Sequence, residues 1–319
     1  MQVNMIFGFL GSGKTTLVRH LLGARARERK LAVIVNEFGQ AGIDGAILEG
    51  AVLEGGAVDM IQLTSGCLCC TLKGPLLSAI EELRDRAGVE HTVIEASGVA
   101  DPEQMIESFS APEFRASVAV GPFVTVVDAA KFAVMREMLG EFYGSQVAHA
   151  DIVLLNKTDL ASPERLEAVR AEVAELNPGA RIVTTVHCDV DAGLVLDALS
   201  GWEPGPGEGG RHHHDRHHHD HHGGHPDFES EVLDAAGPVA RAALESFFAE
   251  LPPEVLRAKG FMVVDGAASL VQFTAGQLEI TPATLNRVPQ MVFIGRGLDR
   301  AGLAARFAFA GAAPEGGTR

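Results

Sequence analysis

The sequence GFLGSGKT occupies residues 8–15 and largely decides how the N-terminal part of the chain is interpreted. It fits the pattern G-x-x-x-x-G-K-[ST], with Lys14 and Thr15 at its end. The apolar run MQVNMIF precedes it, and residues 16–26 have the composition of a helix. A glycine loop between a strand and a helix directs backbone N–H groups and the positive helix end at phosphate oxygens. We therefore predict a phosphate-binding loop, with a plain glycine turn as the alternative.

Further apolar runs, rich in Val and Ile, predict the strands that follow this loop. They lie at residues 31–36, 91–97, 123–129, 151–157 and 181–186. Helical patterns cover residues 74–86, 129–140 and 163–176, and the last begins with Ser162 at the N-cap and Pro163 at N1. Continuous apolar strands that alternate with helices form parallel sheets covered on both faces. The sequence therefore predicts an α/β fold, a P-loop NTPase parallel sheet flanked by helices.

The composition changes sharply at residue 201. The Gly/Pro-rich stretch GWEPGPGEGG opens a segment that contains nine of the chain's 13 His, all between residues 212 and 225. Beyond it, an amphipathic helix at 238–251, four short strands and a last helix at 298–310 predict a small α+β domain. We expect a P-loop domain over residues 1–200, a flexible linker over 201–227 and a C-terminal α+β domain over 228–319.

Charge and hydropathy exclude several classes of partner. The chain has 26 basic and 42 acidic residues and a formal net charge of −16, so its global field repels nucleic acid and anionic membranes. No apolar run spans a bilayer, and the N-terminus lacks the basic region of a secretory signal. Three of the four Cys crowd into residues 67–70, which favours thiol chemistry in a reducing cytoplasm over a disulfide scaffold. We expect a cytoplasmic protein that binds neither nucleic acid nor membrane, and the sequence predicts no particular oligomeric state.

The base of the nucleotide is indicated by Asn156, Lys157 and Asp159, which form N-K-x-D at the end of an apolar strand. A carboxylate at this position can accept from both N1–H and the 2-amino group of guanine, whereas adenine offers no such donor pair. A site that leaves a buried polar group unpaired discriminates strongly against the wrong base. The motif therefore predicts guanine, with an ordinary strand-to-helix turn as the alternative.

Several residues around the loop are candidates for hydrolysis. Lys14 would reach the β- and γ-phosphates, and the Thr15 hydroxyl would ligate Mg²⁺. Glu37 and Glu95 each end an apolar strand, where nucleotide hydrolases place a switch loop or a Mg²⁺-linked carboxylate. A strand-end acid without such a role is an equally good interpretation of each.

The thiol motif Cys67, Cys69 and Cys70 is the most unusual local feature. Thiolates this close in sequence can converge on Zn²⁺, Co²⁺ or Cu⁺. No second Cys pair follows, so an open transfer site is favoured over a closed structural zinc site. Small buried hydrophobes and a redox cysteine are the alternatives. Cys188 stands alone after a strand and is expected in the core.

The histidine tract can bind Zn²⁺, Ni²⁺ or Co²⁺ through neutral imidazoles. It is internal and interrupted by Asp215 and Asp220, which distinguishes it from a purification tag. A flexible frame gives no fixed geometry, so loose capture or buffering of metal is expected, with a solvated linker as the alternative.

The motifs GFLGSGKTTL, NEFG…ID, GCLCC, IEASG and NKTD, in this order, resemble those of the CobW family of P-loop GTPases, a group similar to the nickel-insertion GTPases for urease and hydrogenase. Residues 257–261 (RAKGF) and 292–299 (VFIGRGLD) resemble the family's C-terminal domain. The resemblance implies a GTP hydrolase that binds GTP and GDP with Mg²⁺. It also implies a metallochaperone that carries Zn²⁺, or else Co²⁺ or Ni²⁺, to a client metalloprotein or cofactor-assembly enzyme.

The resemblance also implies site residues, position by position. Phosphates and Mg²⁺ are assigned to Gly11, Ser12, Gly13, Lys14, Thr15 and Thr16. Guanine is assigned to Asn156, Lys157 and Asp159, and the transferred metal to Cys67, Cys69 and Cys70. Catalysis is assigned to Lys14, Glu37 and Glu95, of which Glu95 is also linked to Mg²⁺. Gln40 stands where family members often have Glu, which puts a metal role for that position in doubt.

Two other functions fit the same residues. One is a metal store or sensor whose GTPase activity is incidental, and the other is a regulatory GTPase whose thiols report redox state. The phosphate loop and the switch segment contain no obvious strong general base, so slow intrinsic hydrolysis is expected.

Overall fold

The computed structural model describes residues 1–25, 30–38, 59–65, 73–85, 89–109, 118–197, 228–235, 237–274, 276–284 and 288–311. Residues up to 197 belong to one compact unit, and those from 228 onward belong to a second. None of the helices in these ranges combines the length and the hydrophobicity needed to cross a lipid bilayer.

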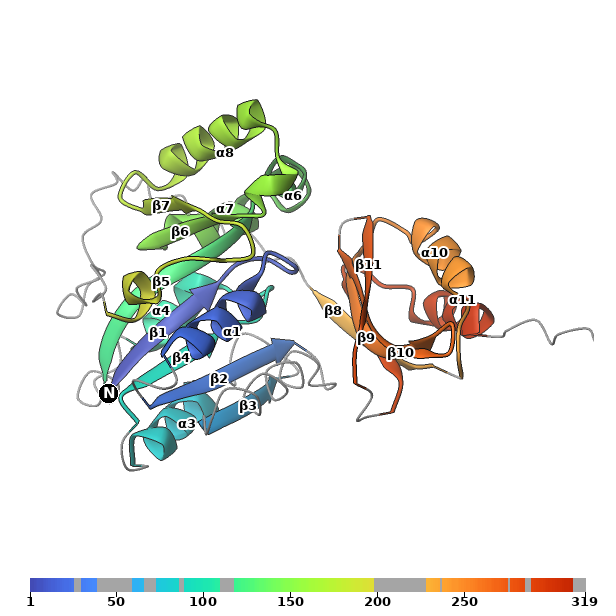
Figure 1. Cartoon of the computed structure of the whole chain (residues 1–319), viewed down its shortest axis with the longest axis horizontal. Helices are drawn as coiled ribbons and strands as arrows, with labels where there is room; N and C mark the ends of the chain where they lie inside the picture. The colour runs from blue at the N-terminus through green and yellow to red at the C-terminus, as the bar shows by residue number, and fades with distance from the viewer. Residues whose placement is uncertain are drawn as a thin grey trace, which may run out of the picture. The chain divides into compact units, whose positions relative to one another are not determined.

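The first unit is a seven-stranded sheet in the order β3-β2-β4-β1-β5-β6-β7 (Figure 1). Every strand pairing in it is parallel. The strands are β1 (Gln2–Phe7), β2 (Leu31–Phe38), β3 (Asp59–Ser65), β4 (His91–Glu95), β5 (Ala119–Asp128), β6 (Ile152–Asn156) and β7 (Arg181–Thr184). The helices are α1 (Lys14–Arg25), α3 (Lys73–Asp85), α4 (Pro102–Phe109), α6 (Phe132–Leu139), α7 (Glu141–Ala148), the 3₁₀ turn η1 (Thr158–Leu160), α8 (Pro163–Leu176) and α9 (Ala192–Leu196).

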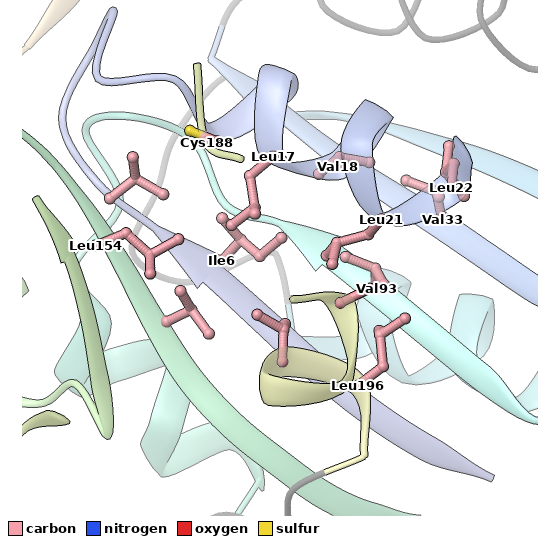
Figure 2. Packing of buried hydrophobic residues seen from close by; sticks show 14 of the residues in the cluster. Ile6, Leu17, Val18, Leu21, Leu22, Val33, Val93, Leu154, Cys188 and Leu196 are labelled. Carbon is pink, nitrogen blue, oxygen red and sulfur yellow. The ribbon is translucent and has the colours of Figure 1, made fainter. Parts of the chain in front are cut away.

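Two apolar clusters cover the two faces of this sheet. Ile6 of β1 packs with α1 and α9 on one face, where Leu17, Leu21 and Leu196 are buried (Figure 2). Its neighbours Met5 and Phe7 face the other way and pack with α3 and α4. Successive side chains of a strand point to opposite faces, so a strand that is apolar throughout must be covered on both. The predicted P-loop NTPase fold is confirmed.

The second unit is a five-stranded antiparallel sheet in the order β11-β10-β9-β12-β8 (Figure 1). Its elements are β8 (Glu229–Asp234), α10 (Arg241–Ala249), β9 (Val255–Val264), β10 (Ala267–Thr274), β11 (Gln277–Pro282), β12 (Gln290–Gly295) and α11 (Arg300–Gly311). Phe247 of α10 and Phe307 of α11 pack edge-to-face on Phe293 of β12, with ring centroids 6.1 and 5.5 Å away. The expected small α+β architecture is therefore present.

Some expected element bounds were wrong. The helix expected at 129–140 begins later, as α6 at Phe132, because Asp128 first makes a turn in which its Oδ1 accepts from the N–H groups of Ala130 and Lys131. Gly140, with φ 56°, then separates α6 from α7. The helix expected to begin at residue 16 begins at Lys14. The strand expected at 123–129 begins earlier, at Ala119.

Candidate functional site

The phosphate loop joins β1 to α1 at the carboxyl edge of the sheet. Gly8, Gly11 and Gly13 have φ values of 133°, 76° and 120°, which side chains rarely tolerate. A Cβ on Gly8 would lie 2.2 Å from the carbonyl oxygen of Val126 in β5. The glycines therefore permit both the loop's curvature and its close approach to the neighbouring strand.

Polar side chains within the loop are arranged for an anionic ligand. Lys14 is 6% exposed, and its Nζ donates to the Gly8 carbonyl oxygen at 2.8 Å. The Ser12 hydroxyl is buried and makes no hydrogen bond to any residue that the structure describes. A buried hydroxyl without a partner costs free energy unless a ligand satisfies it. Thr16 is exposed on the first turn of α1.

Thr15 and Glu95, which the sequence analysis linked separately to Mg²⁺, lie together in the structure. The Thr15 hydroxyl donates to Glu95 Oε1 at 2.7 Å, although the two residues are 80 positions apart. Glu95 ends β4, the strand next to β1, and is only 3% exposed. A hydroxyl beside a buried carboxylate is the all-oxygen donor set that Mg²⁺ prefers. These two side chains therefore fit that ion.

The N-K-x-D motif is tied to the phosphate loop through Asn156. Its Nδ2 donates to the Ser12 carbonyl oxygen at 2.9 Å. Its Oδ1 accepts from Thr185 Oγ1 at 3.1 Å and from the Cys188 N–H at 2.9 Å. The buried amide of Asn156, at the end of β6, thus connects the loop that follows β1 with the segment that follows β7. Asp159, on η1, leaves its carboxylate exposed at the same edge.

Cys188 lies next to the phosphate loop and is fully buried (Figure 2). Its thiol donates to the Gly13 carbonyl oxygen at 3.4 Å. Burial raises the pKa of this thiol to about 12, so it stays protonated at neutral pH. Its burial confirms the expectation of a core residue, and a protonated thiol is a poor metal ligand because metals bind the thiolate.

Several predicted residues cannot be placed in the same way. Cys67, Cys69 and Cys70 lie outside the described residues, as do Gln40 and the histidine tract. Glu37 is described only in its backbone, which is paired with Thr64 of β3. No group of three metal-binding side chains occurs within the described ranges.

Sequence reasoning missed the residues that brace the loops. Gln146 of α7 is 2% exposed, and its Nε2 donates to the carbonyl oxygens of Gly98 and Ala100 at 3.3 Å each. Gly98 is so close to the phosphate loop that a Cβ there would lie 2.8 Å from the Leu10 nitrogen. A buried Gln in a helical apolar pattern was the available signal. The two carbonyl groups that Gln146 contacts could not be predicted without knowing the order of the strands in the sheet.

Comparison with known proteins supports the same interpretation. Residues 2–184 match the CobW/HypB/UreG nucleotide-binding domain, and residues 228–310 match the cobalamin synthesis protein cobW C-terminal domain. The chain is 35% identical to the zinc chaperone CobW of Pseudomonas aeruginosa over 341 aligned positions, covering 95% of this chain and 90% of that protein. It is 30% identical to the zinc chaperone YjiA of Escherichia coli, covering 87% and 86% of the two chains.

Among solved structures, Zn(II)-bound YjiA GTPase from Escherichia coli is 25% identical and aligns over 97% of this chain and 98% of that chain, with a TM-score of 0.46. The match to the nucleotide-binding domain covers more than half of the sequence. The chain therefore belongs to the CobW/HypB/UreG family of P-loop GTPases, with a CobW C-terminal domain, and it binds guanine nucleotide and hydrolyses GTP.

Proposed function

We propose that this GTPase is a zinc chaperone, which binds Zn²⁺ at Cys67, Cys69 and Cys70 and transfers it to a client metalloprotein or cofactor-assembly enzyme. Relatives that align over most of their length are named zinc chaperones. Three neighbouring thiolates suit Zn²⁺ and leave a coordination position open for transfer. The proposed organisation is a GTPase domain over 1–200, a linker over 201–227 and a C-terminal domain over 228–319.

The observation that carries this proposal is where β3 ends. β3 pairs in parallel with β2, and β2 with β4, whose last residue is Glu95. The carboxyl ends of parallel strands lie at one edge of a sheet, so Ser65 and Glu95 are at the same edge. Cys67 follows Ser65 by two positions, and two residues span at most about 7 Å. This connectivity supports a proposed metal site near the edge that carries the phosphate loop.

In the proposed site, each side chain has a distinct task. Lys14 neutralises charge on the β- and γ-phosphates, and Thr15 with Glu95 holds Mg²⁺, which stabilises the charge that develops during hydrolysis. Glu37 belongs to the switch segment that senses the γ-phosphate. Asn156, Lys157 and Asp159 read guanine. GTP orders the switch and brings the thiolates together, and hydrolysis releases them.

Replacing Cys67, Cys69 and Cys70 together with alanine is expected to abolish stoichiometric Zn²⁺ binding, because it removes the proposed ligands. Competition of the protein with a colorimetric chelator measures this binding. It is best done on a chain that lacks residues 212–225, so that the histidines do not contribute. GTP affinity should remain within about 2-fold, because the Thr15–Glu95 and Ser12–Asn156 contacts are untouched.

Cys188→Ala is the matched control, since its buried, protonated thiol should contribute nothing to Zn²⁺ binding. Full Zn²⁺ binding by the triple variant would reject the proposed site. Zn²⁺ binding that disappears only when residues 212–225 are deleted would favour a metal store with incidental GTPase activity.

A further inference from the structure

Asp128 is the last residue of β5 and belongs to none of the sequence motifs. In the sheet, β5 lies between β1, which leads into the phosphate loop, and β6, which leads into N-K-x-D. Asp128 pairs in register with Asn156 of β6, and the Asn156 carbonyl oxygen accepts from the Ala129 N–H at 2.9 Å. A carboxylate therefore lies directly beside the guanine-reading motif.

Both carboxylate oxygens of Asp128 have partners. Oδ2 lies 2.8 Å from Lys157 Nζ. Oδ1 accepts from the N–H groups of Ala130 and Lys131, at 3.1 and 3.2 Å. The Asp128 side chain is 8% exposed, and a buried carboxylate is stable only when paired and hydrogen-bonded. The Lys157 ammonium thus compensates this charge.

Lys157 itself has a constrained backbone. Its φ of 60° lies in the left-handed region, which non-glycine residues adopt uncommonly. The Lys157 carbonyl oxygen accepts from the Leu160 N–H at 3.0 Å, which closes η1. The next residue is held by Thr185, whose carbonyl oxygen accepts from the Thr158 hydroxyl at 3.1 Å. The backbone is fixed by these bonds, and the side chain is fixed by Asp128.

We propose that Asp128 is a positioning residue of the base site: its ion pair holds the Lys157 side chain so that the alkyl stem lies along one face of the bound purine. Alkyl stems of lysine commonly cover apolar or aromatic surface while the ammonium keeps a polar partner. In this arrangement Asp159 hydrogen-bonds to the edge of the base. Asp128 acts through Lys157 on the face of the base. This inference rests on the proposed base-reading role of Lys157 and Asp159.

A double-mutant cycle tests the inference with the variants Asp128→Asn, Lys157→Met and both together. Asparagine keeps the Oδ1 acceptor of the turn and loses the charge, while methionine keeps an alkyl stem and loses the ammonium. Each single variant is expected to weaken GDP binding by about 10-fold, and the double variant is expected to bind GDP no more weakly than either one, because the two residues act as a pair. Fluorescent-GDP titration measures all four proteins.

Binding of IDP, which lacks the 2-amino group of GDP, distinguishes the positioning role of Asp128 from the recognition of the guanine edge by Asp159. Asp128→Asn should weaken GDP and IDP by the same factor, whereas Asp159→Asn should reduce the preference for GDP over IDP. Asp151→Asn is the control, since that carboxylate accepts from the Phe123 N–H at the opposite end of β6. It should lower the unfolding temperature without changing the GDP-to-IDP ratio.

Additive losses in the cycle, or unchanged GDP affinity in Asp128→Asn, would overturn the inference while leaving the base site intact. An unchanged GDP-to-IDP preference in Asp159→Asn would instead overturn the proposed base site itself. Thermal unfolding of each variant shows whether it is folded. If Asp128→Asn is unfolded, Lys157→Met with a wild-type GDP affinity would still reject the pair.

Discussion

Replacing Gly13 with alanine is expected to abolish guanine-nucleotide binding and to destabilise the GTPase domain. Gly13 has φ 120°, and a Cβ there would lie 2.5 Å from Asn156 Nδ2 and 3.0 Å from Cys188 Sγ. Asn156 cannot move away freely, because it is hydrogen-bonded to Ser12, Thr185 and Cys188. Backbone strain and a broken buried network together cost about 2–4 kcal/mol.

Gly23→Ala is the matched control, on the helix α1 that follows the loop, since a Cβ at that position meets no atom within 4 Å. Removing a mid-helix glycine lowers the entropy of the unfolded chain, so this variant should be as stable as the parent or more stable by about 0.5–1 kcal/mol. Thermal unfolding and GDP titration of both variants measure the contrast. Normal GDP affinity in Gly13→Ala would show that the segments after β1 and β7 are not coupled through Asn156.

Replacing Lys14 with alanine is expected to lower kcat/KM for GTP by about 100- to 1,000-fold, the usual loss when one preorganised charge donor is removed. The ammonium is buried in the loop and donates to the Gly8 carbonyl oxygen, so the fold already directs it inward. No other described side chain of the loop is cationic. The developing charge on the γ-phosphate would lose its nearest compensation from the protein.

Phosphate release from GTP measures this loss, and Lys30→Ala is the control because Lys30 is exposed before β2. The Lys30 variant should retain the parent rate. A Lys14→Ala protein that hydrolyses GTP within about 3-fold of the parent rate would contradict the catalytic role proposed for Lys14.

An N-cap residue followed by proline is a local sequence signal for the start of a helix. Ser162 and Pro163 predicted the start of α8, and the Ser162 hydroxyl accepts from the Arg165 N–H in the structure. Asp101 and Pro102 offered the same signal for α4, and Asp101 Oδ1 accepts from the Glu103 N–H.

Two strands were missed because their sequences contain no continuous apolar run. β3 reads DMIQLTS and β8 reads ESEVLD, and each mixes polar with apolar residues. β3 and β8 lie at the ends of their sheets, where one edge of the strand has no partner within the sheet. Edge strands are commonly more polar than central ones, so hydrophobicity alone does not reveal them.

The polar contacts between distant segments depend on the order of the strands, which the sequence does not specify. Asp128 meets Lys157 only because β5 and β6 are neighbours, and Thr15 meets Glu95 only because β1 and β4 are. The positions of Lys14 in the loop after β1 and of Asn156 at the end of β6 were predictable, because they follow from local sequence patterns. Gln146 and Asp128 were not, because each acts through a contact between distant parts of the chain.

The central claim is that the bound nucleotide sets the affinity of the protein for Zn²⁺. It is tested most directly by titrating Zn²⁺ into the protein bound to GDP and, separately, to a non-hydrolysable GTP analogue. In the proposed mechanism the thiol motif follows β3 near the phosphate loop and responds to the γ-phosphate, so Zn²⁺ should bind about 10-fold or more tightly in the GTP-analogue state. Linkage requires Zn²⁺ to tighten the analogue by the same factor. Equal Zn²⁺ affinities in the two nucleotide states would contradict GTP-controlled metal delivery.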